Sequence, residues 1–179
     1  MSASCLGIDV GTTRTKAVLL SPDGGRVLAA AAAPTPQADD GGVAVHVPRA
    51  VRDVAVDVAR RALAAAGPEA RAALGGVAVT SVGEEAVLLD AAGRPVGDVP
   101  TWFAGVGHQP AREHAAELDR RAPVTGLRHP EYTVHVLGWW AQARPQQARA
   151  AVTMTDLGSW LLSTLGPGDL VMDLSLIHI

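Results

Sequence analysis

The chain has 179 residues and a formal net charge of -3, which gives it enough length for one domain with a sizeable core. Its Lys and Arg residues form no basic cluster, and its single cysteine excludes an intramolecular disulfide. No apolar run is long enough to span a bilayer, and the N-terminus has no secretory signal. We therefore expect a cytoplasmic protein without a nucleic-acid or membrane partner.

The N-terminal part of the chain predicts three short antiparallel strands. Apolar runs at Cys5–Val10, Lys16–Leu20 and Arg26–Ala33 predict the strands. They are separated by Gly11-Thr12-Thr13 and by Pro22-Asp23-Gly24-Gly25, which both favour tight turns. We expect the cysteine of the first strand to be buried as a small apolar residue.

The middle of the chain predicts a helix between strands. A loop rich in Gly, Asp and Pro covers Gln37–Pro48, and Arg49–Ala66 then places its larger apolar residues on one helical face. Gly67-Pro68 is expected to end this helix, and the apolar runs Gly76–Val82 and Ala86–Asp90 predict two more strands. This order of elements is typical of a ribonuclease-H-like (actin-like ATPase) α/β domain, whose mixed sheet opens in a three-strand antiparallel meander and is flanked by helices.

The C-terminal part of the chain predicts helices, at about Pro110–Arg121, Val134–Arg144 and Asp156–Leu165. Their tryptophans are interpreted as packing residues. The six histidines show no metal-ligand spacing, and none is interpreted as catalytic.

The first turn predicts an anion-binding site. In the stretch GIDVGTTRTK, the backbone N–H groups of Gly11, Thr12 and Thr13 can point at one anion, and the threonine hydroxyls add donors. Lys16 supplies a positive charge, whereas the carboxylate of Asp9 favours a phosphate only through a divalent metal or its waters. The pattern is neither a P-loop nor a dinucleotide-binding motif. The alternative is an ordinary hairpin in which Gly and Thr only form the turn.

A second polar cluster follows the fourth predicted strand. Its turn carries two adjacent carboxylates, Glu84 and Glu85, and Trp102 follows after a short loop. Paired acceptors at a strand end can bind adjacent sugar hydroxyls, and an aromatic face can cover the apolar side of a sugar. The alternatives are a solvated acidic turn and a core tryptophan.

Together these motifs resemble the FGGY carbohydrate kinases, from about Leu6 to Asp173. The first hairpin is similar to the one that binds nucleotide phosphates in sugar kinases and actin. When the two are aligned backwards from Asp90, Glu84 takes the place of a sugar-contacting residue, which is His in xylulose kinases and Glu in glycerol kinases. Trp102 matches the tryptophan that follows in the same families.

The resemblance implies transfer of a phosphoryl group from ATP, with Mg²⁺, to a hydroxyl of a small sugar or polyol of the pentulose or hexulose type. The implied phosphate and metal contacts come from Asp9 (through water), Gly11, Thr12, Thr13 and Lys16. The implied sugar contacts come from Glu84, Glu85 and Trp102. The general-base aspartate lies in the second domain of the family, so no catalytic residue is assigned in this chain. A homodimer of the full-length protein is compatible with the resemblance.

Two features depart from the family pattern. After the tryptophan the family usually has an acidic or polar residue and then arginine, where this chain has Ala104 and Val106 within Phe103–Val106. The last six residues, Leu174–Ile179, match one in-frame translation of a sequence that resembles a transposon end used in sequencing libraries, and the alternative is a natural tail. We therefore expect residues 1–173 to form the N-terminal kinase domain, residues 174–179 to be an artefactual tail, and the C-terminal kinase domain to be absent, which leaves the fragment inactive.

Two other functions stay open at this point. The chain can be a non-catalytic remnant that binds a sugar or a partner. It can also belong to another actin-like ATPase, which explains the hairpin but not the segment from Glu84 to Trp102.

Overall fold

The computed structural model describes residues 3–21, 23, 25–125, 129–130 and 132–166, and the C-terminal hexapeptide 174–179 lies outside the described residues. The elements are, in chain order, β1 (Ser4–Val10), β2 (Arg14–Leu20), β3 (Val27–Pro34), β4 (Ala38–Asp39), β5 (Ala44–His46), α1 (Pro48–Ala72), β6 (Leu74–Ser81), β7 (Ala86–Leu89), β8 (Val99–Pro100), η1 (Trp102–Ala104), α2 (His108–Glu113), α3 (Ala115–Thr125), α4 (Thr133–Ala143), α5 (Pro145–Ala150), β9 (Thr153–Asp156) and α6 (Leu157–Leu165).

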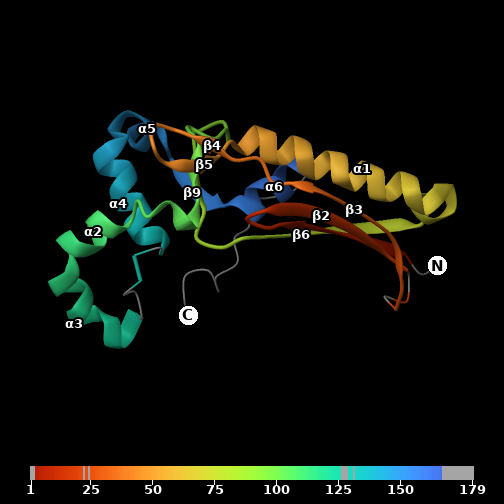
Figure 1. Cartoon of the computed structure of the whole chain (residues 1–179), viewed down its shortest axis with the longest axis horizontal. Coiled ribbons are helices and arrows are strands. Elements are labelled where there is room, and N and C mark those ends of the chain that lie inside the picture. The colour runs from red at the N-terminus through yellow and green to blue at the C-terminus, as the bar shows by residue number, and fades with distance from the viewer. Residues whose placement is uncertain (1–2, 22, 24, 126–128, 131, 167–179) are drawn as a thin grey trace.

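The main sheet has the strand order β3-β2-β1-β6 (Figure 1). Strands β1, β2 and β3 pair antiparallel, and β6 pairs parallel with β1. A parallel neighbour requires a crossover, and the long helix α1 supplies it. This arrangement confirms the predicted three-strand meander, the mixed sheet and the ribonuclease-H-like order of elements.

The two faces of β1 have opposite environments, as the side-chain alternation of a strand requires. Leu6, Ile8 and Val10 are at most 2% exposed and belong to the same core cluster as the buried face of α1. Cys5 and Asp9 point to the other face. The prediction that Cys5 is buried is wrong, because this residue lies on the face away from α1 and is exposed.

Helix α1 is longer than its periodicity predicts. Val51, Ala55, Val58 and Ala62 are fully buried against the sheet, which confirms the predicted apolar face. The expected stop at Gly67-Pro68 is a kink instead, where Gly67 has a φ of 86° and the helix resumes to Ala72. Glycine tolerates this left-handed conformation, and proline fits the first turn of the resumed helix because its missing N–H is not needed there.

Several short elements were not predicted. The expected loop Gln37–Pro48 contains β4 and β5, and β5 pairs with β8. Strand β9 pairs antiparallel with β7 and precedes α6. Asp156 caps the N-terminus of α6, because its side chain accepts a hydrogen bond from the Ser159 N–H at 2.8 Å. The helix expected over Pro110–Arg121 is divided into α2 and α3.

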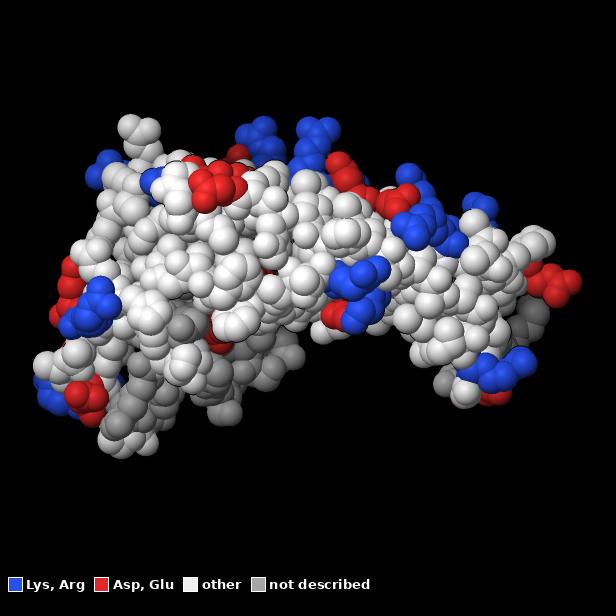
Figure 2. Space-filling model, in the orientation of Figure 1, with Lys and Arg blue, Asp and Glu red and all other residues white. Residues whose placement is uncertain are grey.

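A smaller core lies between α4 and β7. It contains Leu88, Val136 and Trp140, with Val106 packed against it. Trp160 belongs to the main core, so the interpretation of these tryptophans as packing residues is confirmed. On the face shown in Figure 2, the described Lys and Arg residues are interspersed with Asp and Glu. No helix among the described residues is long and apolar enough to cross a membrane.

The main core makes a stability prediction. Leu19 is fully buried between β1, β3 and α1. We expect Leu19→Ala to lower the free energy of unfolding by about 2–5 kcal/mol, because it removes buried methyl groups and leaves a cavity. Val27→Ala is the matched control, since Val27 is 62% exposed, and a change within about 0.5 kcal/mol is expected there. Chemical denaturation measures both, and equal effects would contradict the assignment of this core.

Candidate functional site

The turn between β1 and β2 is fixed from one side by the segment that follows β3. The Thr35 hydroxyl donates to the Gly11 carbonyl at 2.7 Å, and the Thr35 N–H donates to the Thr13 carbonyl at 3.1 Å. The Gln37 side-chain amide donates to the Thr12 carbonyl at 2.9 Å. All three turn carbonyls are therefore engaged. Within the described part of the chain, the N–H groups of Thr12 and Thr13 donate to no protein acceptor, as an anion-binding turn requires.

The first residue of this turn has to be small. The Gly11 N–H donates to the Arg14 carbonyl at 3.2 Å and closes the turn. A Cβ at Gly11 would lie 3.1 Å from that same carbonyl oxygen. A larger residue would therefore push the backbone apart where the turn is tightest.

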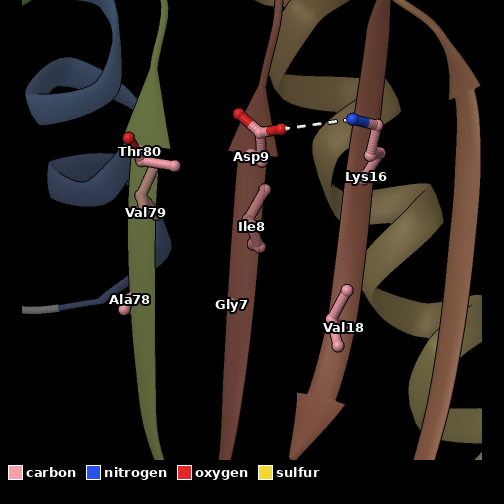
Figure 3. A pocket seen from close by; sticks show the side chains of 8 residues that line it. All are labelled: Gly7, Ile8, Asp9, Lys16, Val18, Ala78, Val79 and Thr80. Atoms are coloured by element: carbon pink, nitrogen blue, oxygen red, sulfur yellow. Dashed lines mark ion pairs between the residues drawn. The ribbon is translucent and has the colours of Figure 1, made fainter. Parts of the chain in front are cut away.

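Asp9 and Lys16 lie opposite each other on β1 and β2 and point to the face away from α1 (Figure 3). The Lys16 Nζ is 3.6 Å from the Asp9 Oδ2, and both side chains are about half exposed, at 54% and 46%. An exposed pair of this kind contributes at most about 1 kcal/mol to stability. Breaking this ion pair therefore costs little free energy, which leaves Lys16 able to contact a phosphate and Asp9 able to contact a hydrated cation.

These two charged residues stand at the edge of a shallow pocket across three strands. Its volume is about 290 Å³, and Gly7, Val18 and Ala78 give it an apolar floor (Figure 3). Thr80 of β6 lies beside Asp9 because the two are partners in the parallel register. The turn after β6 consequently begins at the edge of the sheet where β1 ends.

Glu84 lies in that turn and holds α4. Its Oε2 accepts from the Thr133 N–H at 2.7 Å and from the Thr133 hydroxyl at 2.9 Å. A carboxylate at a helix N-terminus satisfies an unpaired N–H and interacts favourably with the helix dipole. Glu84 has a φ of 62°, which is an unfavourable backbone conformation for a residue other than glycine and is often found at functional sites.

Glu85 points the opposite way, into the protein. Its side chain has no exposed surface, its Oε1 accepts from the Trp102 N–H at 3.3 Å, and its Oε2 lies 3.6 Å from the His46 Nε2. Burial raises the pKa of Glu85 to about 8 and lowers the pKa of His46. Glu85 thus has no surface through which to contact a sugar, and its position behind Trp102 suits a supporting role.

Trp102 joins the two clusters that the sequence predicts. Its indole Nε1 donates to the Thr12 hydroxyl at 3.1 Å, across 90 residues of sequence. Trp102 as a whole residue is 43% exposed, and its ring stands edge-on to Phe103. The structure therefore brings the turn Gly11-Thr12-Thr13, the predicted phosphate turn, together with the exposed tryptophan, and Asp9 and Lys16 lie on the adjoining strands.

The residues that depart from the family pattern have structural roles. Ala104 ends the short helix η1, where its N–H donates to the Thr101 carbonyl at 2.9 Å. Val106 packs in the smaller core. Neither position supplies a polar group to the site.

Sequence reasoning missed four supporting residues, namely Thr35, Gln37, His46 and Thr133. Their roles depend on contacts made over long sequence separations, such as 24 residues for Thr35 and 49 for Thr133. The one local signal was the pair of adjacent carboxylates, which the turn before β7 directs to opposite sides.

A magnesium ion fits this site only if water molecules and phosphate oxygens supply most of its ligands. Among the described residues there is no group of three or more metal-ligating side chains. Mg²⁺ commonly uses one or two carboxylates and completes its shell with water and phosphate oxygens. The half-exposed carboxylate of Asp9, beside the phosphate turn, meets that requirement.

Comparison with known proteins identifies the family. Residues 4–178 match the N-terminal domain of the FGGY family of carbohydrate kinases. The chain belongs to this family. The match covers both predicted clusters, so the alternative of a different actin-like ATPase is set aside. No curated protein matches the chain.

Solved structures of FGGY kinases share the fold. The chain is 25% identical to the xylulose kinase from Rhodospirillum rubrum, with a TM-score of 0.85. The match covers 98% of the present chain and 41% of the xylulose kinase. The ligand-bound xylulose kinase from Lactobacillus acidophilus is 16% identical, with a TM-score of 0.79, and the match covers 98% of the present chain and 39% of that kinase. The Plasmodium falciparum glycerol kinase with ADP is 16% identical, with a TM-score of 0.77, and the match covers 94% of the present chain and 35% of that kinase. The FGGY chain thus spans at most about two fifths of these three relatives.

The environment of Glu85 predicts a pH dependence of stability. Because its pKa is raised from 4.5 to about 8, the folded FGGY chain keeps a proton that the unfolded chain releases, and stability falls as pH rises through this range. The full effect is on the order of 5 kcal/mol. We expect Glu85→Gln to remove this slope in denaturation curves measured from pH 5 to 8.5. Glu69→Gln on the exposed side of α1 is the control. Parallel slopes for Glu85→Gln and the wild type would show that Glu85 is ionised when folded.

Proposed function

We propose that this chain is the phosphate- and sugar-binding part, residues 1–173, of a kinase that transfers the γ-phosphoryl group of ATP to a hydroxyl of a small sugar or polyol. The observation that carries the proposal is the 3.1 Å hydrogen bond from Trp102 to Thr12. It places an exposed aromatic ring, suited to the apolar side of a sugar, directly beside a turn suited to phosphate.

The phosphate side would act by positioning and by charge. The N–H groups of Thr12 and Thr13 and the ammonium of Lys16 would contact phosphate oxygens, and Asp9 would hold the water shell of Mg²⁺. When bound, Mg²⁺ neutralises charge that develops on the phosphates during transfer. Catalysis of phosphoryl transfer consists largely of such positioning and electrostatic stabilisation.

The sugar side is proposed only as far as the substrate class. Trp102 offers an exposed ring, and Glu84 places a carboxylate in the turn at the same edge of the sheet. The solved relatives are named as kinases of xylulose, gluconate and glycerol, which are all small polyhydroxy compounds. We assign no catalytic base within the chain, and we expect the chain alone to give no turnover.

The single lysine of the chain allows a direct test of the phosphate site. An amine-reactive reagent can label only Lys16 and the N-terminal amine. If Lys16 contacts phosphates, MgADP should slow acylation of Lys16 several-fold while the N-terminal amine reacts at an unchanged rate, as quantified by peptide mass spectrometry. Asp9→Asn should weaken this protection if Asp9 holds the metal. Equal labelling of Lys16 with and without MgADP would argue against the phosphate site.

The activity itself requires the whole protein. Since the chain spans at most 41% of the three relatives named above, reading the source coding sequence across codon 173 and onward defines the protein to assay. We expect ADP formation that depends on one of a panel of pentoses, ketoses, polyols and sugar acids. Thermal stabilisation by a sugar without ADP formation would instead support the alternative of a binding remnant, and no response to any of them would overturn the proposal.

A further inference from the structure

A buried imidazole and a buried carboxyl face each other beneath Trp102. His46 and Glu85 both have side chains with no exposed surface. The His46 Nδ1 lies 2.7 Å from the Pro36 carbonyl oxygen. Because a carbonyl can only accept, Nδ1 carries the proton of the neutral ring, and the His46 Nε2 is left with a lone pair.

The partner of that lone pair is Glu85. The Glu85 Oε2 is 3.6 Å from Nε2, and among the described residues both atoms are buried without a hydrogen-bond partner. A bare carboxylate oxygen against a bare nitrogen would leave two buried acceptors unpaired, which is costly. A proton on Oε2 resolves this, because the carboxylic acid can then donate to Nε2 after a small approach.

The pair closes a ring of contacts around the phosphate turn. The Glu85 Oε1 accepts from the Trp102 N–H, and the Trp102 indole donates to the Thr12 hydroxyl. On the other side, Thr35 and Gln37 donate to the carbonyls of Gly11 and Thr12. Pro36 lies between these two residues, and it is Pro36 that His46 holds. The ring thus runs from Pro36 through His46, Glu85 and Trp102 to Thr12 and back.

We propose that His46 and Glu85 are positioning residues that share one proton, hold the Trp102 loop, and set the distance between the tryptophan and the phosphate turn. The importance of this distance for a kinase rests on the proposed function. The geometry itself does not, because each contact of the ring can be observed without nucleotide or sugar.

The first test needs no variant. At pH 7, the wild-type chain should show the His46 side chain as the Nδ1–H tautomer in long-range ¹H–¹⁵N spectra, with Nε2 unprotonated. The carboxyl carbon of Glu85 should have the ¹³C chemical shift of a carboxylic acid. An imidazolium signal from His46 together with a carboxylate signal from Glu85 would overturn the shared-proton arrangement.

The second test measures whether the pair holds Trp102. The four tryptophans give four indole N–H signals, and Trp102→Phe identifies the one from Trp102. Thr12→Val removes the acceptor and defines the chemical shift of the released indole. We expect Glu85→Ala to move the Trp102 signal most of the way to that value, with the other three signals in place. Glu85→Gln should leave it near the wild-type position, because its amide keeps an acceptor for Trp102 and supplies a donor for His46.

The outcomes are distinguishable from those of the kinase proposal. A folded Glu85→Ala chain with an unmoved Trp102 signal would show that the pair only fills the core. A Glu85→Gln signal at the released position would contradict the hydrogen-bond account, because the amide keeps both hydrogen bonds. If Glu85→Ala does not fold, His46→Ala applies the same criterion, and the wild-type spectra decide the protonation in any case. Protection of Lys16 by MgADP tests the phosphate site separately, so either proposal can fail alone.

Discussion

The parallel pairing of β1 with β6 is the constraint on which the site depends. Parallel strands end at the same edge of a sheet, so the Asp9 end of β1 and the turn after β6 are brought together although about 70 residues separate them. The pairing needs a crossover, and α1 provides it while burying Val51, Val58 and Ala62 against the sheet. Burial of this helical face offsets the entropy of closing so long a loop.

The two adjacent glutamates show how this edge separates residues of one type into different roles. Glu84 is only partly buried and holds the N-terminus of α4 through Thr133. Glu85 turns inward, and burial there favours the neutral acid. Their chemical identity is the same, and the difference comes entirely from what surrounds each carboxyl group.

The parts of the fold with local periodicity could be predicted from the sequence. The meander, the apolar face of α1 and the first turn all depend on neighbouring residues. Strands β5 and β9 could not be predicted, because their partners β8 and β7 lie far along the chain. The burial of Cys5 was wrong for a related reason, since an apolar strand does not reveal which of its faces is covered. Likewise the sequence places Glu84, Glu85 and Trp102 near one another. Only the tertiary contacts with His46 and Thr133 show that Glu85 points into the core and that Glu84 points to α4.

Under the proposed function, Thr12 would couple the sugar side of this FGGY domain to its phosphate side. Its hydroxyl oxygen accepts from the Trp102 indole, so its own O–H proton remains to be donated elsewhere. A hydroxyl that accepts one hydrogen bond becomes a stronger donor in the next. A phosphate oxygen in the turn would receive that donation, and movement of Trp102 would weaken it. Phosphoryl transfer depends on alignment to within about an ångström, so a domain that fixes its aromatic ring and its phosphate turn through one hydroxyl gains alignment from a single contact.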